Sequence, residues 1–146
     1  MPNFFIVGAA KSGTTSLYEM LNNHPDVFMP DIKEPHFMVA NQVKGKIPSC
    51  VANISDYCNL YEDAGTRLTG EASVLYLYYY QEAISNIKKH CGEDAKIIIM
   101  LRNPVSRAYS AYLYAKMYDP NETLDFMPAL NAEDERINKG INPMLY

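Results

Sequence analysis

Residues 3–23, NFFIVGAAKSGTTSLYEMLNN, decide the fold of this chain. Asn3–Gly8 is a short apolar run that ends in glycine, which is typical of a buried strand. Small residues and a glycine fill Ala9–Thr14 and predict a turn. The apolar residues of Leu17–Leu21 then recur at helical spacing, and this helix should end near Asn22–Pro25. The stretch therefore predicts a strand, a tight loop and a helix whose N-terminus lies at the loop.

The loop itself, GAAKSGTT at Gly8–Thr15, partly fits the phosphate-binding pattern G-x-x-x-x-G-K-[ST]. Its two glycines and last threonine fit, but Thr14 stands where the pattern has lysine, and Lys11 lies inside the loop. Small residues let the backbone wrap an anion, and a helix N-terminus offers free N–H groups and a partial positive charge. The loop therefore predicts a bound anion. A plain strand–turn–helix junction without a ligand is the alternative.

The remaining chain continues with strand and helix signals. Ile84, Ile87 and Cys91 share a helical face, which predicts a helix over Tyr80–His90. Lys96–Leu101 is a second continuous apolar strand. The other expected elements are a short strand at Val27–Met29, an ordered loop at Asp31–Phe37, a short helix at Ile54–Tyr61, a helix capped by Asn103 that runs from Pro104 to Tyr118, and a last helix from Leu124 to Gly140.

This order of elements predicts an α/β fold with a parallel sheet. Ligands on such sheets bind at the carboxyl ends of the strands, and both Gly8 and Arg102 follow a predicted strand. Two loops far apart in sequence are therefore expected to converge on one site.

Composition narrows the class of protein. The 146 residues suffice for one domain with one core, so 1–146 is expected to be a single domain. A net charge of -4 argues against a protein that coats nucleic acid or binds membranes through basic residues. No apolar run reaches the length of about 18 residues that a membrane-spanning helix needs, and no signal-peptide pattern is present. With three cysteines that lack metal-ligand spacing, a reduced, cytoplasmic setting is expected.

Four segments together resemble the sulfotransferases that use PAPS, 3′-phosphoadenosine 5′-phosphosulfate. The resemblance is to the carbohydrate, heparan-sulfate-like branch and its bacterial relatives. The segments stand in family order: FFIVGAAKSGTTSLYEMLNNHPDV at 4–27, KEPHFM at 33–38, GEASVLYLYY at 70–79 and IIIMLRNPVSRAYSAYLY at 97–114. The resemblance implies a P-loop-type sheet flanked by helices in three α/β/α layers, incomplete in this chain, with a further acceptor-side region expected after Tyr146.

The resemblance also implies roles for individual residues. Lys11 would contact the donor sulfate and bridging oxygen, where charge develops as the sulfuryl group leaves, and Glu34 would be the general base. His36 would support Glu34 or the acceptor. The resemblance implies no metal, and PAP is the product of the donor. The residues implied to hold the donor are Lys11, Ser12, Gly13, Thr14, Thr15 and Ser16 around the 5′-phosphosulfate, and Arg102 and Ser110 at the 3′-phosphate. Ala72 departs from the family, whose members often carry lysine there.

The residues also fit this chemistry apart from the resemblance. Transfer of a sulfuryl group to a hydroxyl needs a base, cations and an in-line arrangement of the reacting atoms. Glu34 is a candidate for the base because Pro30 and Pro35 stiffen the loop that carries it. A solvated Glu34 and a structural His36 are the plainer interpretations. Tyr76–Tyr80 fits an acceptor cleft or ordinary packing, and Glu133–Arg136 is expected to be a solvated helix face. The acceptor would be a carbohydrate or small molecule; a non-catalytic PAP-binding module and a P-loop kinase or NTPase are the competing functions.

Overall fold

The computed structural model describes residues 1–139 of the chain. These residues fall into two compact units, Met1–Leu101 and a helical unit that begins at Arg102. The first unit contains the sheet.

Four parallel strands form this sheet, in the order β2-β3-β1-β4. β1 pairs with β3 on one side, Ile6 opposite Ala72, and with β4 on the other, Ile6 opposite Ile98. The predicted parallel α/β sheet is therefore confirmed. The strands are β1 (Phe4–Gly8), β2 (Val27–Phe28), β3 (Leu68–Ala72) and β4 (Lys96–Ile99).

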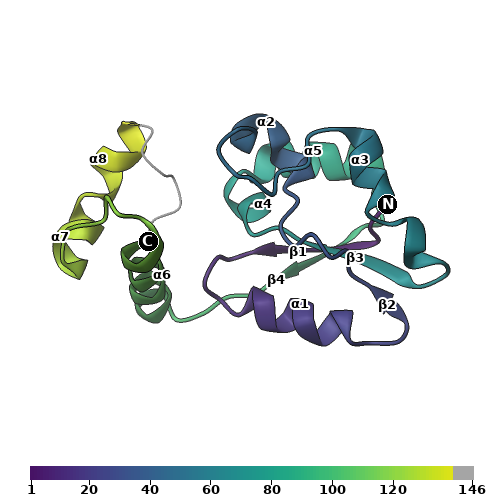
Figure 1. Ribbon diagram of the computed structural model, residues 1–146, viewed down its shortest axis with the longest axis horizontal. Coiled ribbons are helices and arrows are strands. Elements are labelled where there is room, and N and C mark those ends of the chain that lie inside the picture. The colour runs from purple at the N-terminus through teal and green to yellow at the C-terminus, as the bar shows by residue number, and fades with distance from the viewer. Residues whose placement is uncertain (140–146) are drawn as a thin grey trace. The chain divides into compact units, whose positions relative to one another are not determined.

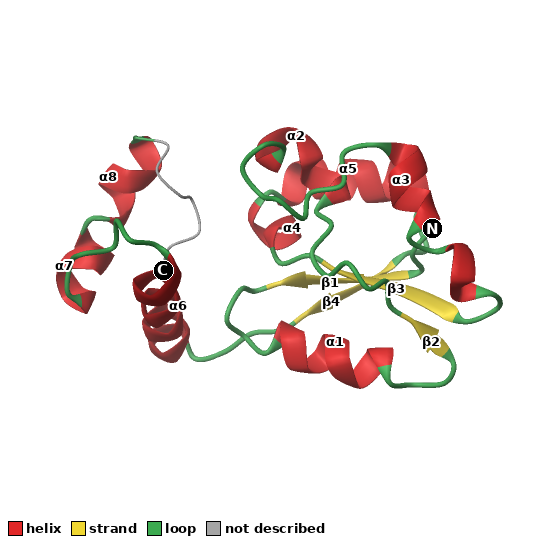
Figure 2. Ribbon diagram, viewed as in Figure 1, coloured by secondary structure: helices red, strands yellow, loops and turns green. Residues whose placement is uncertain are grey.

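Helices cover both faces of the sheet, which gives the expected three layers. Figure 1 shows α1 beneath the sheet and the other helices of this unit above it, and Figure 2 shows the same layers by type of element. The helices of the first unit are α1 (Thr14–Asn22), α2 (Ala40–Val43), α3 (Ile54–Asn59), α4 (Leu75–Tyr78) and α5 (Tyr80–Cys91), with 3₁₀ turns at Phe37–Val39 and Glu62–Ala64.

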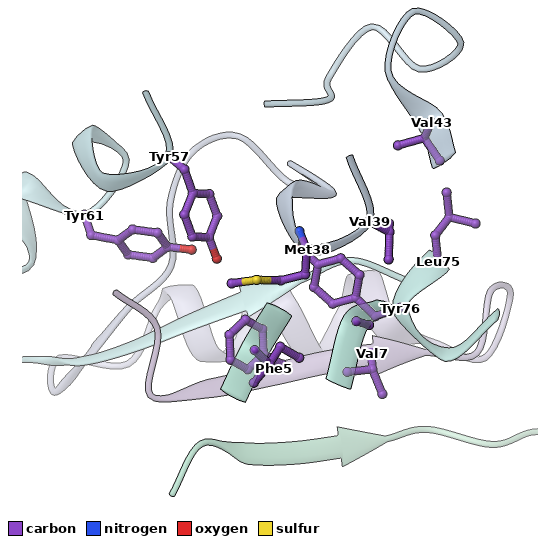
Figure 3. Close-up of a cluster of buried hydrophobic side chains, with 11 residues drawn as sticks. Phe5, Val7, Met38, Val39, Val43, Tyr57, Tyr61, Leu75 and Tyr76 are labelled. Atoms are coloured by element: carbon purple, nitrogen blue, oxygen red, sulfur yellow. Dashed lines mark hydrogen bonds between the residues drawn. The ribbon is translucent and has the colours of Figure 1, made fainter. Parts of the chain in front are cut away.

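The side chains of β1 pack into two separate cores, because successive side chains of a strand point to opposite faces of the sheet. Phe4 and Ile6 pack with α1 through Tyr18. Phe5 and Val7 lie in the larger core under the helices of the opposite face. Figure 3 labels Phe5 and Val7 of β1 beneath seven further members of that core: Met38, Val39, Val43, Tyr57, Tyr61, Leu75 and Tyr76.

The second unit packs three helices around its own small core. Asn103 caps the first of them by accepting a hydrogen bond from the Ser106 N–H (3.2 Å). Buried Glu122 forms an ion pair with Arg136. The helices are α6 (Pro104–Tyr118), α7 (Phe126–Asn131) and α8 (Glu133–Asn138), and the core residues are Ala111, Tyr112, Ala115 and Ala129.

Several details of the sequence prediction were wrong. Both helices predicted from apolar spacing are present, but the buried residues differ from the spacing pattern: Tyr18 is buried on α1 while Met20 is exposed, and Ala83 and Ile87 are buried on α5 while Ile84 is exposed. The predicted last helix is two short helices, because the chain breaks at Ala132, and its predicted end at Gly140 lies outside the described residues. Arg136 is not part of a solvated face, because it pairs with a buried carboxylate.

Candidate functional site

The loop between β1 and α1 is built for close approach of the backbone to a ligand. Gly8 has φ 143° and Gly13 has φ 91°, conformations that glycine adopts without strain. A side chain at Gly8 would also meet the carbonyl oxygen of Val74 at 3.0 Å. Two hydrogen bonds tie the loop to the chain after β4: Ala9 N–H to the Met100 carbonyl (2.8 Å) and Met100 N–H to the Gly8 carbonyl (2.7 Å).

The N-terminus of α1 presents polar groups suited to an anion. Gly13 occupies the N-cap, no side chain caps the helix, and its first turn contains no acidic residue. The buried hydroxyl of Ser12 has no hydrogen-bond partner, which is unusual because buried polar atoms are almost always paired. The free N–H groups and this hydroxyl form a cradle that fits a phosphate or sulfate group. Lys11 lies in the same loop with φ 63°.

A second loop brings Glu34 to the same edge of the sheet. The Glu34 N–H donates to the carbonyl of Ala72, the last residue of β3 (3.0 Å). Ala72 is paired with Ile6 of β1, two residues before Gly8, so both loops lie at the carboxyl ends of adjacent parallel strands. The side chain of Ser49 further fixes this loop by donating to the Glu34 carbonyl (3.0 Å).

The Glu34 carboxylate lies between a lysine and a histidine. Lys33 Nζ is 2.8 Å from Glu34 Oε1, and His36 Nε2 is 3.6 Å from Glu34 Oε2. Partial burial opposes the charge, but the interactions with His36 and Lys33 outweigh it and lower the pKa of Glu34 below its ordinary value. The carboxylate is therefore ionised throughout the neutral pH range. Glu34 is 30 % exposed, so it is neither a fully solvated nor a fully buried carboxylate.

His36 is buried directly beside this carboxylate. Its ring packs edge-on against Tyr76 with 6.4 Å between the ring centroids. Its Nδ1 atom is buried without a hydrogen-bond partner, and its Nε2 faces Glu34. The structure therefore brings Glu34 and His36 together. Of the other two histidines, His24 is exposed after α1, and His90 at the end of α5 packs edge-on against Phe37, with 5.5 Å between the ring centroids.

Beneath this loop is a buried polar cluster that the sequence pattern did not predict. Glu71 of β3 is completely buried and accepts hydrogen bonds from Ser73 Oγ (2.6 Å) and from the Tyr57 hydroxyl. Desolvation raises the pKa of Glu71, although hydrogen bonds from Ser73, Tyr57 and Tyr76 act in the opposite direction. Glu71, Ser73 and Tyr76 all belong to residues 70–79, one of the segments that carry the family resemblance. That segment was the only feature of the sequence that could have pointed to this cluster.

Arg102 and Ser110 belong to the second unit. Arg102 is exposed and immediately precedes the capping residue of α6, while Ser110 is half-buried and lies midway along that helix. Eight residues separate them, about two helical turns. Tyr76, in contrast, is core rather than cleft: it is buried against Phe5, whereas Tyr78 and Tyr80 are exposed.

Within 1–139, no group of three or more histidine, cysteine, aspartate or glutamate side chains is arranged to hold a metal ion. None of the helices in this part of the chain is long and apolar enough to cross a membrane.

The fold and the two loops define an α/β protein with an anion-binding strand–loop–helix. The model of the sulfotransferase domain matches residues 1–139, so the chain belongs to the sulfotransferase family, as the sequence resemblance predicted. Over its whole length it superimposes on 62% of the crystal structure of a sulfotransferase from Alicyclobacillus acidocaldarius, with a TM-score of 0.89 and 41% sequence identity.

Curated relatives include carbohydrate-modifying enzymes. Human carbohydrate sulfotransferase 15 is 28% identical over 78% of this chain and 27% of its own length. Human heparan sulfate glucosamine 3-O-sulfotransferase 3B1 is 34% identical over 77% of this chain and 26% of its own length. The chain thus spans about a quarter of the curated relatives it matches.

Proposed function

We propose that residues 1–146 form one PAPS-binding domain of a sulfotransferase that transfers a sulfuryl group to a hydroxyl or amine of a carbohydrate or small-molecule acceptor. The observation that carries this proposal is the meeting of two loops at one sheet edge. The Gly8–Ser16 loop offers an anion cradle with an unpaired buried hydroxyl, and the ionised Glu34 stands at the end of the neighbouring strand. The relatives' names support a carbohydrate acceptor.

In this proposal the first loop holds the 5′ end of the donor. Ser12, Gly13, Thr14, Thr15 and Ser16 supply N–H and hydroxyl groups around the 5′-phosphosulfate, and Lys11 supplies the positive charge. Arg102 and Ser110 hold the 3′-phosphate, since a guanidinium and a hydroxyl about two turns apart can grip one anion along α6. When bound, PAPS supplies the sulfuryl group, and PAP is the product; no metal is required.

Glu34 is the proposed general base. It takes the proton from the acceptor hydroxyl while the acceptor oxygen bonds to sulfur and the bond from sulfur to the 5′-phosphate oxygen breaks. Lys11 stabilises the negative charge that remains on that departing oxygen. His36 holds the Glu34 carboxylate in place through its Nε2 atom, since its ring is buried and fixed against Tyr76. Glu34 then releases the proton to solvent.

The test is sulfate transfer from labelled PAPS to a panel of sugars and small alcohols, using the full protein. Glu34→Gln keeps the shape of the side chain but cannot accept the proton, so turnover should fall by about 10²–10⁴-fold. The affinity for PAP, measured by titration calorimetry, should stay unchanged.

The matched control is Glu93→Gln, which removes a carboxylate that is 82% exposed and should keep full activity. Substantial turnover by Glu34→Gln would assign the base to another residue. Absence of PAP binding by the wild-type protein would refute the proposed function as a whole.

A further inference from the structure

The loop that carries Glu34 has a backbone that its own residues do not favour. Glu34 has φ 61° and His36 has φ 52°, both in the left-handed region that non-glycine residues rarely adopt. Such conformations persist where the surrounding structure holds them, and they cost on the order of 1–3 kcal/mol each. Contacts from outside the loop must therefore hold it.

Two of those contacts are buried hydroxyl groups that accept hydrogen bonds from backbone N–H groups of the loop. The His36 N–H donates to Ser73 Oγ (3.1 Å), and the Met38 N–H donates to the Tyr76 hydroxyl (3.1 Å). Both hydroxyls are buried, so no bulk water competes for these hydrogen bonds. A hydroxyl accepts well only when its own hydrogen points elsewhere.

Glu71 is the buried carboxylate next to both hydroxyls. Ser73 Oγ donates to Glu71 Oε1 at 2.6 Å. The Tyr76 hydroxyl lies close enough to the same carboxylate for each group to shift the pKa of the other. By accepting the Ser73 hydrogen, Glu71 turns the lone pairs of Ser73 toward the loop, and its nearby carboxylate favours the same orientation of the Tyr76 hydroxyl. The Tyr57 hydroxyl donates to the same carboxylate, whereas the Tyr57 ring contacts the loop by stacking on Phe37, with 4.2 Å between the ring centroids.

We propose that Glu71 is a positioning residue: through the hydroxyls of Ser73 and Tyr76 it fixes the Glu34–Met38 backbone and so aims the Glu34 carboxylate. It does not touch the reacting atoms. The effect on the loop stands on the hydrogen bonds alone, whereas the effect on sulfate transfer rests on the proposed function.

The direct test is amide hydrogen exchange of His36 and Met38, followed by NMR in the full protein. Ser73→Ala should speed exchange at His36 alone, and Tyr76→Phe at Met38 alone, each by about tenfold or more. Glu71→Gln has one acceptor oxygen in place of two, so at least one of the two amides should exchange faster by a similar factor. In the Ser73→Ala background, Glu71→Gln should add nothing further at His36.

The matched control is Tyr57→Phe, which also removes one hydrogen bond from Glu71 but touches neither amide. It should leave exchange at His36 and Met38 within about twofold of wild type, even where it lowers the melting temperature. A variant that loosens the core in general would speed exchange at many amides. The proposal requires the change to be concentrated at these two.

Kinetics provide the second measurement. A displaced Glu34 should lower kcat by up to about 100-fold in Glu71→Gln and Ser73→Ala, with the KM for PAPS unchanged because the Gly8–Ser16 loop is untouched. Tyr57→Phe should keep most of its kcat. A plain loss of stability would instead reduce the amount of active enzyme in all three variants.

The outcomes separate the two proposals. Unchanged protection of both amides in Glu71→Gln overturns the positioning role, whatever the activity. Should Glu71→Gln fail to fold, wild-type kcat in both Ser73→Ala and Tyr76→Phe overturns it equally. A wild-type protein that transfers no sulfate, but whose amides respond as expected, refutes the function and leaves the positioning role standing.

Discussion

The two loops of the site reach their shapes by different means. The Gly8–Ser16 loop uses the conformations of Gly8 and Gly13 and local hydrogen bonds, such as Ser12 N–H to the Ala9 carbonyl (3.2 Å), and is joined to Met100 by hydrogen bonds at its entry. The Lys33–Met38 loop has no glycine, and its His36 and Met38 N–H groups donate hydrogen bonds to the hydroxyls of Ser73 and Tyr76, 37 and 38 positions along the chain. The conformation of the Gly8–Ser16 loop therefore depends mainly on its own residues, whereas that of the Lys33–Met38 loop depends on hydrogen bonds to another part of the fold.

The two loops should therefore be sensitive to different kinds of substitution. A loop shaped by its own backbone is damaged by substitutions within it. A loop held by distant hydroxyls is damaged by substitutions that never touch the ligand. Three changes test this contrast.

The largest effect is expected at Lys11, the charged residue of the first loop. Lys11→Ala removes the cation proposed to stabilise the departing oxygen, so kcat should fall by about 10²–10³-fold. Steady-state kinetics with PAPS measure it. Lys89→Ala, an exposed lysine in the last turn of α5, is the control and should behave as wild type. Equal losses in both variants would contradict a specific role for Lys11.

An intermediate effect is expected from the backbone of the same loop. Gly13→Ala meets only ordinary contact with Met100 (3.6 Å) but must hold φ 91°, so strain of about 1–3 kcal/mol should weaken PAP binding by about 5- to 150-fold. Calorimetric titration with PAP measures the loss.

Gly45→Ala provides the control, because Gly45 also has positive φ (79°) and open space around it, yet lies outside the proposed site. It should lower the melting temperature without changing PAP affinity. If Gly13→Ala bound PAP as tightly as Gly45→Ala, the loop would not depend on its glycine conformation.

The smallest effect concerns charge in the second loop. Lys33 is among the groups that lower the pKa of Glu34, so Lys33→Met should raise that pKa toward its ordinary value of 4.5. Because the base works only when ionised, the acid limb of kcat/KM should move to higher pH while the rate at neutral pH is kept. An NMR titration of the Glu34 carboxyl carbon measures the shift directly, and an unchanged pKa would assign the effect to His36.

The same change affects stability with a defined sign. A carboxylate whose pKa is lowered on folding stabilises the folded state above its unfolded pKa, and this contribution is lost as the pH falls through the folded pKa. Since the carboxylate is partly exposed, the contribution is modest. Lys33→Met should therefore lower the stability slightly at neutral pH, and this difference should disappear as the pH falls below the folded pKa of Glu34.

Parts of the fold that follow from local pattern were predicted correctly. β1 and β4 are continuous apolar runs, and Asn103 with Pro104 marks the start of α6. β3 was missed, because its residues Leu68–Ala72 contain a threonine, a glycine and a glutamate in place of an apolar run. Only glycine fits at position 70, because Phe4 and Met29 pack directly over it: a Cβ there would lie 2.1 Å from the Phe4 ring.

The residues of the candidate site also differ in how far the sequence could reveal them. Resemblance pointed to Glu34 and His36, and the structure brings these two together. It could not reveal Glu71, since a buried glutamate is exceptional and nothing local marks it. Its burial is tolerable only because Ser73 and Tyr57, from separate elements, satisfy its oxygens. The roles of Lys11, Arg102 and Ser110 stay predictions.

The pair of hydrogen bonds that joins Gly8 and Ala9 to Met100 has a thermodynamic consequence. A phosphate-binding loop that must become ordered on binding loses conformational entropy, and that loss reduces the affinity. Here the entry to the loop is fastened to the chain after β4 before any ligand arrives. Most of the interaction free energy with the donor should therefore appear as affinity, with an enthalpy of binding dominated by the anion's hydrogen bonds and little ordering of the loop.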